Sequence, residues 1–243
     1  LTLHAPIVNQ HLGLGVAVLN DKIGPTNTTS VNASIAYRMN LSAKSKLALG
    51  LSGGINVLQA NLNAVDLDVQ GDAAFQNNLK NAVTPSVGFG AYYSRERFYA
   101  GFSTPDLLQN TYSVSTQSNT STLIGKEKRH YFLIAGTLVK LGSQLDFKPT
   151  TLVKLTPGAP IQADVTASFI ISKKILLGAM YRTGDAVGAL LGINFTEQLY
   201  LGYSYDWSYG LKTGTYNNGS HELMLRYDFI FTDGRQIHSP RYF

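Results

Sequence analysis

The stretch IQADVTASFII, residues 161–171, decides the fold of this chain. Every second residue is apolar, and the residues between them are polar from Gln162 to Ser168. A period of two predicts a β-strand whose two faces meet different surroundings. Residues 31–40 repeat the pattern, with Val31 and Ile35 on one face and Asn32 and Ser34 on the other. Strands of this length, with one face in lipid and one in a lumen, are typical of a membrane-spanning β-barrel.

The composition favours the same interpretation. Only 14% of the 243 residues are charged and 11% are aromatic, with 14 Tyr and 11 Phe against a single Trp. This suits a lipid-facing wall with interfacial aromatic residues better than a water-facing surface. No run of apolar residues is long enough for a membrane-spanning helix, so a crossing of the bilayer would require a closed barrel of strands.

The alternation recurs along the chain and predicts about thirteen antiparallel strands. Because single-chain bacterial barrels usually have an even number of strands, we expect that at least one strand is miscounted or precedes this sequence. The predicted bounds are 1–7, 12–21, 29–41, 46–58, 85–94, 97–104, 129–141, 145–155, 160–171, 174–183, 186–196, 199–210 and 220–230.

The connections between these strands fall into two alternating classes, which predict the sidedness of the barrel. Outer-membrane barrels have short periplasmic turns and longer extracellular loops. We therefore assign the short turns 8–11, 42–45, 94–97, 142–144, 172–174 and 196–198 to the periplasm. The links assigned to the cell exterior are 22–28, 59–84, 105–128, 156–160, 184–185 and 211–219.

The last predicted strand gives an independent indication of the same sidedness. It alternates and ends on an aromatic residue, which resembles the C-terminal signal read by the barrel-assembly machinery. The residues of this signal are Leu223, Leu225, Tyr227 and Phe229. Such a strand ends in the periplasm, so counting hairpins backward from it agrees with the loop lengths.

No motif in the sequence predicts catalysis, a metal or a cofactor. The chain has no Cys, and its five histidines lack the spacing of metal ligands. Gly13-Leu-Gly15 and Gly88-Phe-Gly90 precede no helical pattern, so neither is expected to bind a nucleotide. The net charge of +5 is scattered, which argues against nucleic acid as a partner. We expect a protein that is not an enzyme.

Charged residues on inner-face positions of neighbouring strands are the main candidate site. Charges in a barrel interior must be paired or hydrated, so they could stabilise the wall, hold a plug or line a path. We favour the stabilising role. The residues of this predicted lumenal network are Arg182, Asp206, Glu222, Arg226 and Asp228.

Three segments outside the strands are candidates for partner contacts. Residues 110–122 form a polar run that predicts a mobile surface loop, and residues 59–84 have enough apolar content for a short helix or a fold over the barrel mouth. Residues 231–243 form a tail after the barrel of residues 1–230. Its charge and apolar anchors predict contact with a periplasmic component through Arg241, Tyr242 and Phe243, whereas the alternative is a disordered end.

Five segments in order give the chain a family resemblance. They are Asn20–Thr28, Gly184–Leu190, Tyr203–Asp206, Gly219–Glu222 and Ser239–Phe243. Together they closely resemble the PorP/SprF family of outer-membrane proteins of the type IX secretion system of Bacteroidota, over nearly the whole chain. Members usually begin with a signal peptide and a further segment rich in Asn, Tyr and Phe. This sequence begins without either of them. The difference suggests a full barrel of about fourteen strands with part of its N-terminal region missing here.

The resemblance implies a role in secretion and gliding motility. SprF-like members serve cell-surface adhesins by engaging their C-terminal secretion domains, and PorP-like members are associated with periplasmic and inner-membrane parts of the system. It therefore implies an outer-membrane, multi-pass protein that contacts an adhesin outside the cell, other secretion components in the periplasm, and lipid. Both branches stay open. The alternative, from a different class, is an outer-membrane channel or transporter for small solutes.

Overall fold

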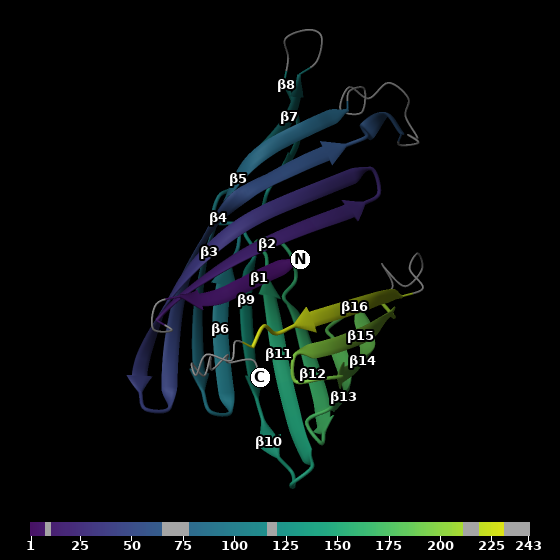
Figure 1. Cartoon of the computed structure of the whole chain (residues 1–243). Helices are drawn as coiled ribbons and strands as arrows, with labels where there is room; N and C mark the ends of the chain where they lie inside the picture. Colours follow the sequence, from purple (N-terminus) through teal and green to yellow (C-terminus); the bar gives the residue numbers. More distant parts are fainter. Residues whose placement is uncertain (8–10, 65–77, 116–120, 211–218, 231–243) are drawn as a thin grey trace. The chain divides into compact units, whose positions relative to one another are not determined.

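The computed structural model describes residues 1–7, 11–64, 78–115, 121–210 and 219–230. The chain forms two compact units, the first from residues 1–39, 48–91 and 103–131 and the second from residues 40–47, 92–102 and 132–243. Most described residues are in strands, and most strands pair with their neighbours along the chain, except that β6 pairs with β9 and β9 pairs with β11 (Figure 1). The order in the large sheet is β1-β2-β3-β4-β5-β6-β9-β11-β12-β13-β14-β15-β16, with β10 paired to β11.

The strands of the large sheet differ in length, and β2 to β5, with 12 to 17 residues each, are the longest. The first six are β1 (Thr2–Ile7), β2 (Leu12–Ile23), β3 (Thr26–Ser42), β4 (Ser45–Ala60), β5 (Leu79–Arg95) and β6 (Phe98–Thr104). The others are β9 (Tyr131–Thr137), β10 (Val139–Lys140), β11 (Leu145–Leu155), β12 (Gln162–Ile171), β13 (Ile175–Arg182), β14 (Ala186–Asn194), β15 (Leu199–Ser208) and β16 (Ser220–Tyr227).

The prediction of an antiparallel sheet of about thirteen strands is confirmed, whereas some bounds were wrong. Residues 22–28 were predicted as a link, but only Gly24 and Pro25 separate β2 from β3. This tight turn is possible because Gly24 adopts a φ of +55°, which few residues with a side chain tolerate. Strand β5 begins at Leu79, six residues before the predicted start. The predicted strand 129–141 is split into β9 and β10 at Leu138.

The two longest predicted loops contain regular structure. Within residues 105–128, a separate two-stranded sheet consists of β7 (Thr111–Ser115) and β8 (Ser121–Lys126), which overlap the predicted mobile loop 110–122 on either side of residues 116–120, which lie outside the described residues. This corrects the loop prediction, because alternating Thr, Ser and Val suit a strand as well as a loop. In the link between β4 and β5, a 3-10 helix spans Leu62–Ala64. Residues 65–77 and the tail 231–243 lie outside the described residues.

The hairpin of β12 and β13 shows how a local turn fixes the register of the second unit. Ser172 and Lys173 have φ values of 52° and 58°, and the amide of Lys174 donates to the carbonyl of Ile171 at 2.9 Å. Positive φ at both central residues defines the turn whose twist matches antiparallel strands. It places Asp164 directly opposite Arg182.

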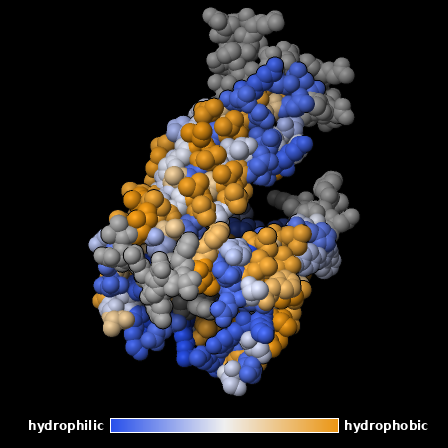
Figure 2. Space-filling model, in the orientation of Figure 1, coloured by the Kyte–Doolittle hydropathy of each residue, from blue (hydrophilic) through white to orange (hydrophobic). Residues whose placement is uncertain are grey.

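The two faces of the sheet are distinguished by their residues, and we call them the apolar face and the polar face. On β12, Val165 and Phe169 on the apolar face are exposed, whereas Asp164 and Ser168 on the polar face are buried. In the view of Figure 2, hydrophobic residues gather over the strands and hydrophilic residues near strand ends. Among the described residues, no helix is long and apolar enough to span a membrane.

Candidate functional site on the polar face

A cluster of five charged residues is centred on Arg182 in the second unit. The Arg182 guanidinium donates from Nε to Asp164 Oδ1 at 2.9 Å and from Nη2 to Asp164 Oδ2 at 3.5 Å. Its Nη1 atom lies 3.4 Å from Asp206 Oδ2 and 3.6 Å from Asp185 Oδ2. Lys154 Nζ lies 3.0 Å from Asp164 Oδ2. Three carboxylates and two cations therefore meet around one fork-shaped side chain.

Small residues on β14 allow Arg182 to reach Asp206 across an intervening strand. Ala186 pairs with Arg182 and is 1% exposed, and Gly188 pairs with Asp206. A Cβ atom added to Gly188 would lie 2.7 Å from Asp206 Oδ1. A side chain at this position would therefore push the Asp206 carboxylate away. The glycine makes the ion pair possible.

Burial determines how much this cluster contributes to folding. The side chain of Asp164 is 9% exposed, and that of Arg182 is 21% exposed. Buried charges are tolerated when they are paired and hydrogen-bonded, and removing one partner is costly. A guanidinium stays charged, so it pairs with carboxylates and does not exchange protons. A hollow of about 260 Å³ adjoins Asp164, with Thr166, Met180 and Tyr99 in its lining.

A second charged group lies at the opposite end of the strands, around Arg226 of β16. Arg226 Nε lies 3.3 Å from Asp228 Oδ2, a distance that allows an ion pair although the geometry is not that of a hydrogen bond. The Arg226 guanidinium stacks 4.9 Å from the ring centroid of Tyr200, its cross-strand neighbour. The Tyr200 ring lies over Gly192, where any side chain would collide with it.

The structure places the five predicted network residues in different surroundings. Arg182 and Asp206 meet in the first group, and Arg226 and Asp228 meet in the second. Glu222 is exposed and accepts a hydrogen bond at 3.5 Å from Ser204, its cross-strand partner. These groups differ from the single network expected, because strand register places Arg226 and Asp206 near opposite ends of the β15–β16 hairpin.

Sequence reasoning missed the residues that complete the first cluster, namely Lys154, Asp164 and Asp185. The signal was present in the hairpin. A two-residue turn at Ser172 and Lys173 places Asp164 opposite Arg182, and opposite charges on facing positions indicate a cross-strand pair. Asp185 follows Arg182 by three residues across the next turn.

The predicted assembly signal lies at the end of β16. Leu223 and Leu225 are 75% and 72% exposed on the apolar face, and Tyr227 and Phe229 are also exposed. The rings of Tyr227 and Phe229 meet edge to face with centroids 4.9 Å apart. The predicted periplasmic contact residues Arg241, Tyr242 and Phe243 lie outside the described residues.

In the first unit, hydrogen bonds fix the base of the β7–β8 hairpin. The Tyr112 hydroxyl donates to Glu127, and Asn110 donates to Glu127 Oε2 from its backbone N at 3.2 Å and from Nδ2 at 2.7 Å. Thr84 Oγ1 lies 3.2 Å from the Tyr112 hydroxyl. Burial and the hydrogen bond to Glu127 raise the pKa of Tyr112 above its ordinary value. This hairpin is therefore anchored to β5.

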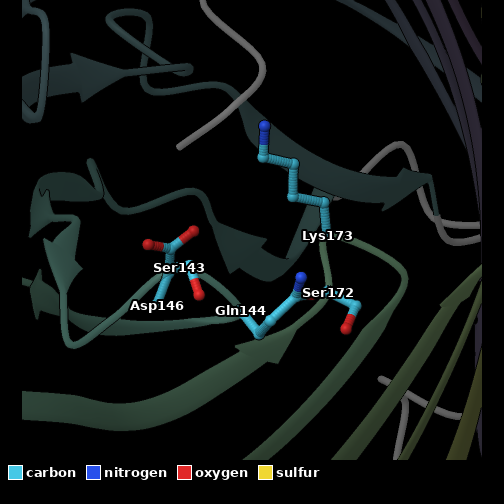
Figure 3. A pocket seen from close by; sticks show the side chains of 5 residues that line it. All are labelled: Ser143, Gln144, Asp146, Ser172 and Lys173. Carbon is cyan, nitrogen blue, oxygen red and sulfur yellow. The ribbon is translucent and has the colours of Figure 1, made fainter.

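A hollow of about 270 Å³ lies at the turns of the second unit, lined by Ser143, Gln144, Asp146, Ser172 and Lys173 (Figure 3). The figure shows that the Lys173 ammonium extends away from the Asp146 carboxylate. The polar ends of these side chains do not converge on one point. We assign no ligand to this hollow.

Two solved structures have folds similar to this chain. The toluene transporter TbuX of Ralstonia pickettii is 8% identical, with a TM-score of 0.46 over 82% of this chain and 73% of that one. The monoaromatic hydrocarbon channel CymD is 10% identical, with a TM-score of 0.47 over 92% of this chain and 79% of that one. A comparison with curated proteins gives no match.

The family comparison covers almost all of the sequence. The family described as type IX secretion system membrane protein PorP/SprF matches residues 1–227, which include every described strand. This agrees with the resemblance found in the five sequence segments. The chain belongs to the PorP/SprF family of type IX secretion system membrane proteins.

Proposed function

We propose that the sheet closes into a multi-pass β-barrel of the outer membrane that serves type IX secretion as a binding and anchoring component, without enzymatic activity. The extracellular side, which carries the longer links between strands, holds the C-terminal secretion domain of a cell-surface adhesin. The periplasmic side, which carries the short turns, and the tail 231–243 contact other secretion components. The family match over residues 1–227 carries this proposal.

The distribution of exposed residues supports the placement in a membrane. Among the described residues, the buried side chains are more often polar than hydrophobic, and many large apolar side chains are exposed. Water-soluble monomers rarely expose contiguous apolar surface of this extent. Lipid contact would remove the apolar face from water, while the polar face would line the barrel interior.

The binding role is tested by purifying the native protein from its membrane under mild detergent. We expect a secreted protein to co-purify through its C-terminal domain, and that domain alone, fused to a fluorescent protein, to bind the purified barrel.

Deletion of residues 237–243 should leave assembly intact and weaken adhesin secretion, because β16 is retained. Normal secretion together with unchanged co-purifying chains would count against the tail contact.

Sidedness is tested with cysteine substitutions at two exposed positions. Gln109 precedes the β7–β8 hairpin, and Lys44 lies in the turn between β3 and β4 with an exposed side chain. An impermeant maleimide added to whole cells should label Gln109→Cys and leave Lys44→Cys unlabelled. Ser45 is unsuitable as a site because it is buried beside Ser42. Labelling of Lys44→Cys alone would reverse the proposed orientation.

The electrical conductance of the purified protein distinguishes the proposed anchoring role from that of a channel for small solutes. The ion pairs around Arg182 and the ring of Tyr200 over Gly192 occupy the polar face. We therefore expect the purified protein to conduct poorly in planar bilayers. Large and steady unitary currents would favour the channel instead.

A further inference from the structure

A row of amide side chains crosses four strands of the first unit on the apolar face. Asn20 Nδ2 donates to Asn27 Oδ1 at 3.0 Å and to Thr29 Oγ1 at 2.8 Å. Asn27 Nδ2 donates to Gln59 Oε1 at 3.5 Å, and Gln59 Nε2 donates to Asn81 Oδ1 at 2.6 Å. We call Asn20, Asn27, Thr29, Gln59 and Asn81 the amide row.

The amide row directly follows an apolar band of membrane height. On β3 the band runs from Val31 to Leu41, ten residues apart. That is about 33 Å along a strand, or about 25 Å along the membrane normal at a tilt of about 40°. This equals the height of the apolar band of an outer-membrane barrel, about 25 Å. Bands of the same length run from Leu47 to Val57 on β4 and from Val83 to Tyr93 on β5.

The polarity of the sheet inverts at this row. Below it, the polar face of β4 carries Ser52, Gly54 and Asn56. At and beyond it, Ala60 at the end of β4 is buried in an apolar cluster with Leu62 of the 3-10 helix and Leu79 of β5, against which Leu58, Ala82 and Tyr112 pack. A sheet with its apolar side chains inward and amides outward is in water. Figure 2 shows hydrophilic residues over these ends of β2 to β5. In the proposed outer-membrane barrel, the row therefore lies at the membrane boundary.

The exposed amides retain hydrogen-bonding capacity toward that boundary. Each amide has two N–H donors and a carbonyl oxygen with two lone pairs. The ladder uses one donor of Asn27 and one of Gln59. Lys22 pairs with Asn27 across β2 and β3, so a cation lies on the same face one position farther from the band. The second unit instead has aromatic residues near strand ends, namely Tyr181, Trp207 and Tyr209.

We infer that the amide row binds the sugar headgroup of a glycolipid of the outer leaflet, with Lys22 facing a phosphate on that sugar. The inference rests on the proposed outer-membrane orientation, in which this end of β2 to β5 is extracellular. Sugar hydroxyls both donate and accept, as amides do, whereas a phosphate group only accepts. A hydroxyl-rich headgroup therefore fits a row of amides better than a phospholipid headgroup does.

This inference is tested by measuring how the protein binds lipids in detergent, with native mass spectrometry as the readout. The two lipid probes are rough lipopolysaccharide and phosphatidylglycerol. Asn20→Ala with Gln59→Ala removes two amides. We expect lipopolysaccharide binding to fall about fivefold from the loss of hydrogen bonds. Asn20→Asp with Gln59→Glu keeps the shape and repels phosphate, so binding should fall about tenfold or more. Binding of phosphatidylglycerol to the alanine variant should be unchanged.

The matched control is Gln144→Ala with Gln198→Ala, two amides in turns of the second unit, which should bind lipopolysaccharide as the wild type does. Heat-modifiable mobility on gels verifies folding, and the alanine variant decides if the acidic one does not fold. Wild-type binding by the alanine variant would overturn the inference, as would a parallel loss of phosphatidylglycerol. Adhesin binding is measured separately, so its failure would implicate only the proposed function.

Discussion

Ala167→Arg should prevent most of the protein molecules from reaching the folded, membrane-inserted form. Ala167 lies in the middle of β12 on the exposed apolar face, opposite Ala179 of β13. Arg at the bilayer midplane of a barrel costs roughly 2–4 kcal/mol. The fraction of heat-modifiable folded protein after refolding into vesicles measures the effect.

Thr166→Arg is the matched control for this substitution. Thr166 is the neighbour of Ala167 on the polar face and lines the hollow of about 260 Å³. A cation there can remain hydrated, so we expect a much smaller loss of folded protein. The sequence suggests Ser168 for this control, but Ser168 is 5% exposed and packs against Gly178. Equal losses in Ala167→Arg and Thr166→Arg would contradict the assignment of faces.

Arg182→Gln should destabilise the folded protein strongly, by roughly 3 kcal/mol, because it removes the shared partner of the buried Asp164 and of the partly buried Asp185 and Asp206. Asp164 would keep only Lys154, and Asp206 would lose the cation 3.4 Å away. Urea unfolding in vesicles, followed by tryptophan fluorescence, gives the change in the free energy of unfolding.

A double-mutant cycle with Asp164→Asn separates the ion pair from general damage. If the pair matters, Arg182→Gln with Asp164→Asn should be less destabilised than the sum of the single variants, with a coupling of roughly 1–3 kcal/mol. Arg226→Gln provides a comparison, because its guanidinium lies in the more exposed second group. Additive effects at Arg182 and Asp164 would show that the contact does not stabilise the fold.

The positions of most strands were predictable from the sequence because a strand with one apolar face has a strict period of two. Residues 161–171 match β12 almost residue for residue. The early start of β5 was not predictable in this way. Leu79 and Lys80 lie beyond the amide row, where Leu79 belongs to a small buried apolar cluster, and Asn81 interrupts the apolar alternation at the row.

The candidate site was predictable only in part, for a related reason. Alternation identifies Arg182 and Asp206 as polar-face residues, but it does not show which strand ends they share. That depends on the register fixed by each turn, such as Ser172 and Lys173 with their positive φ values. The path from Arg182 to Asp206 depends further on Gly188, which leaves room for the carboxylate.

The single tryptophan of the chain allows a direct test of the central claim that the apolar face contacts lipid. Trp207 lies on this face of β15, opposite Val187, and is 56% exposed in the protein alone. In vesicles, its emission should be blue-shifted and quenched by lipids brominated near the headgroup, because it lies close to a strand end. Emission typical of water, quenched by acrylamide and unaffected by any brominated lipid, would contradict the membrane-spanning arrangement.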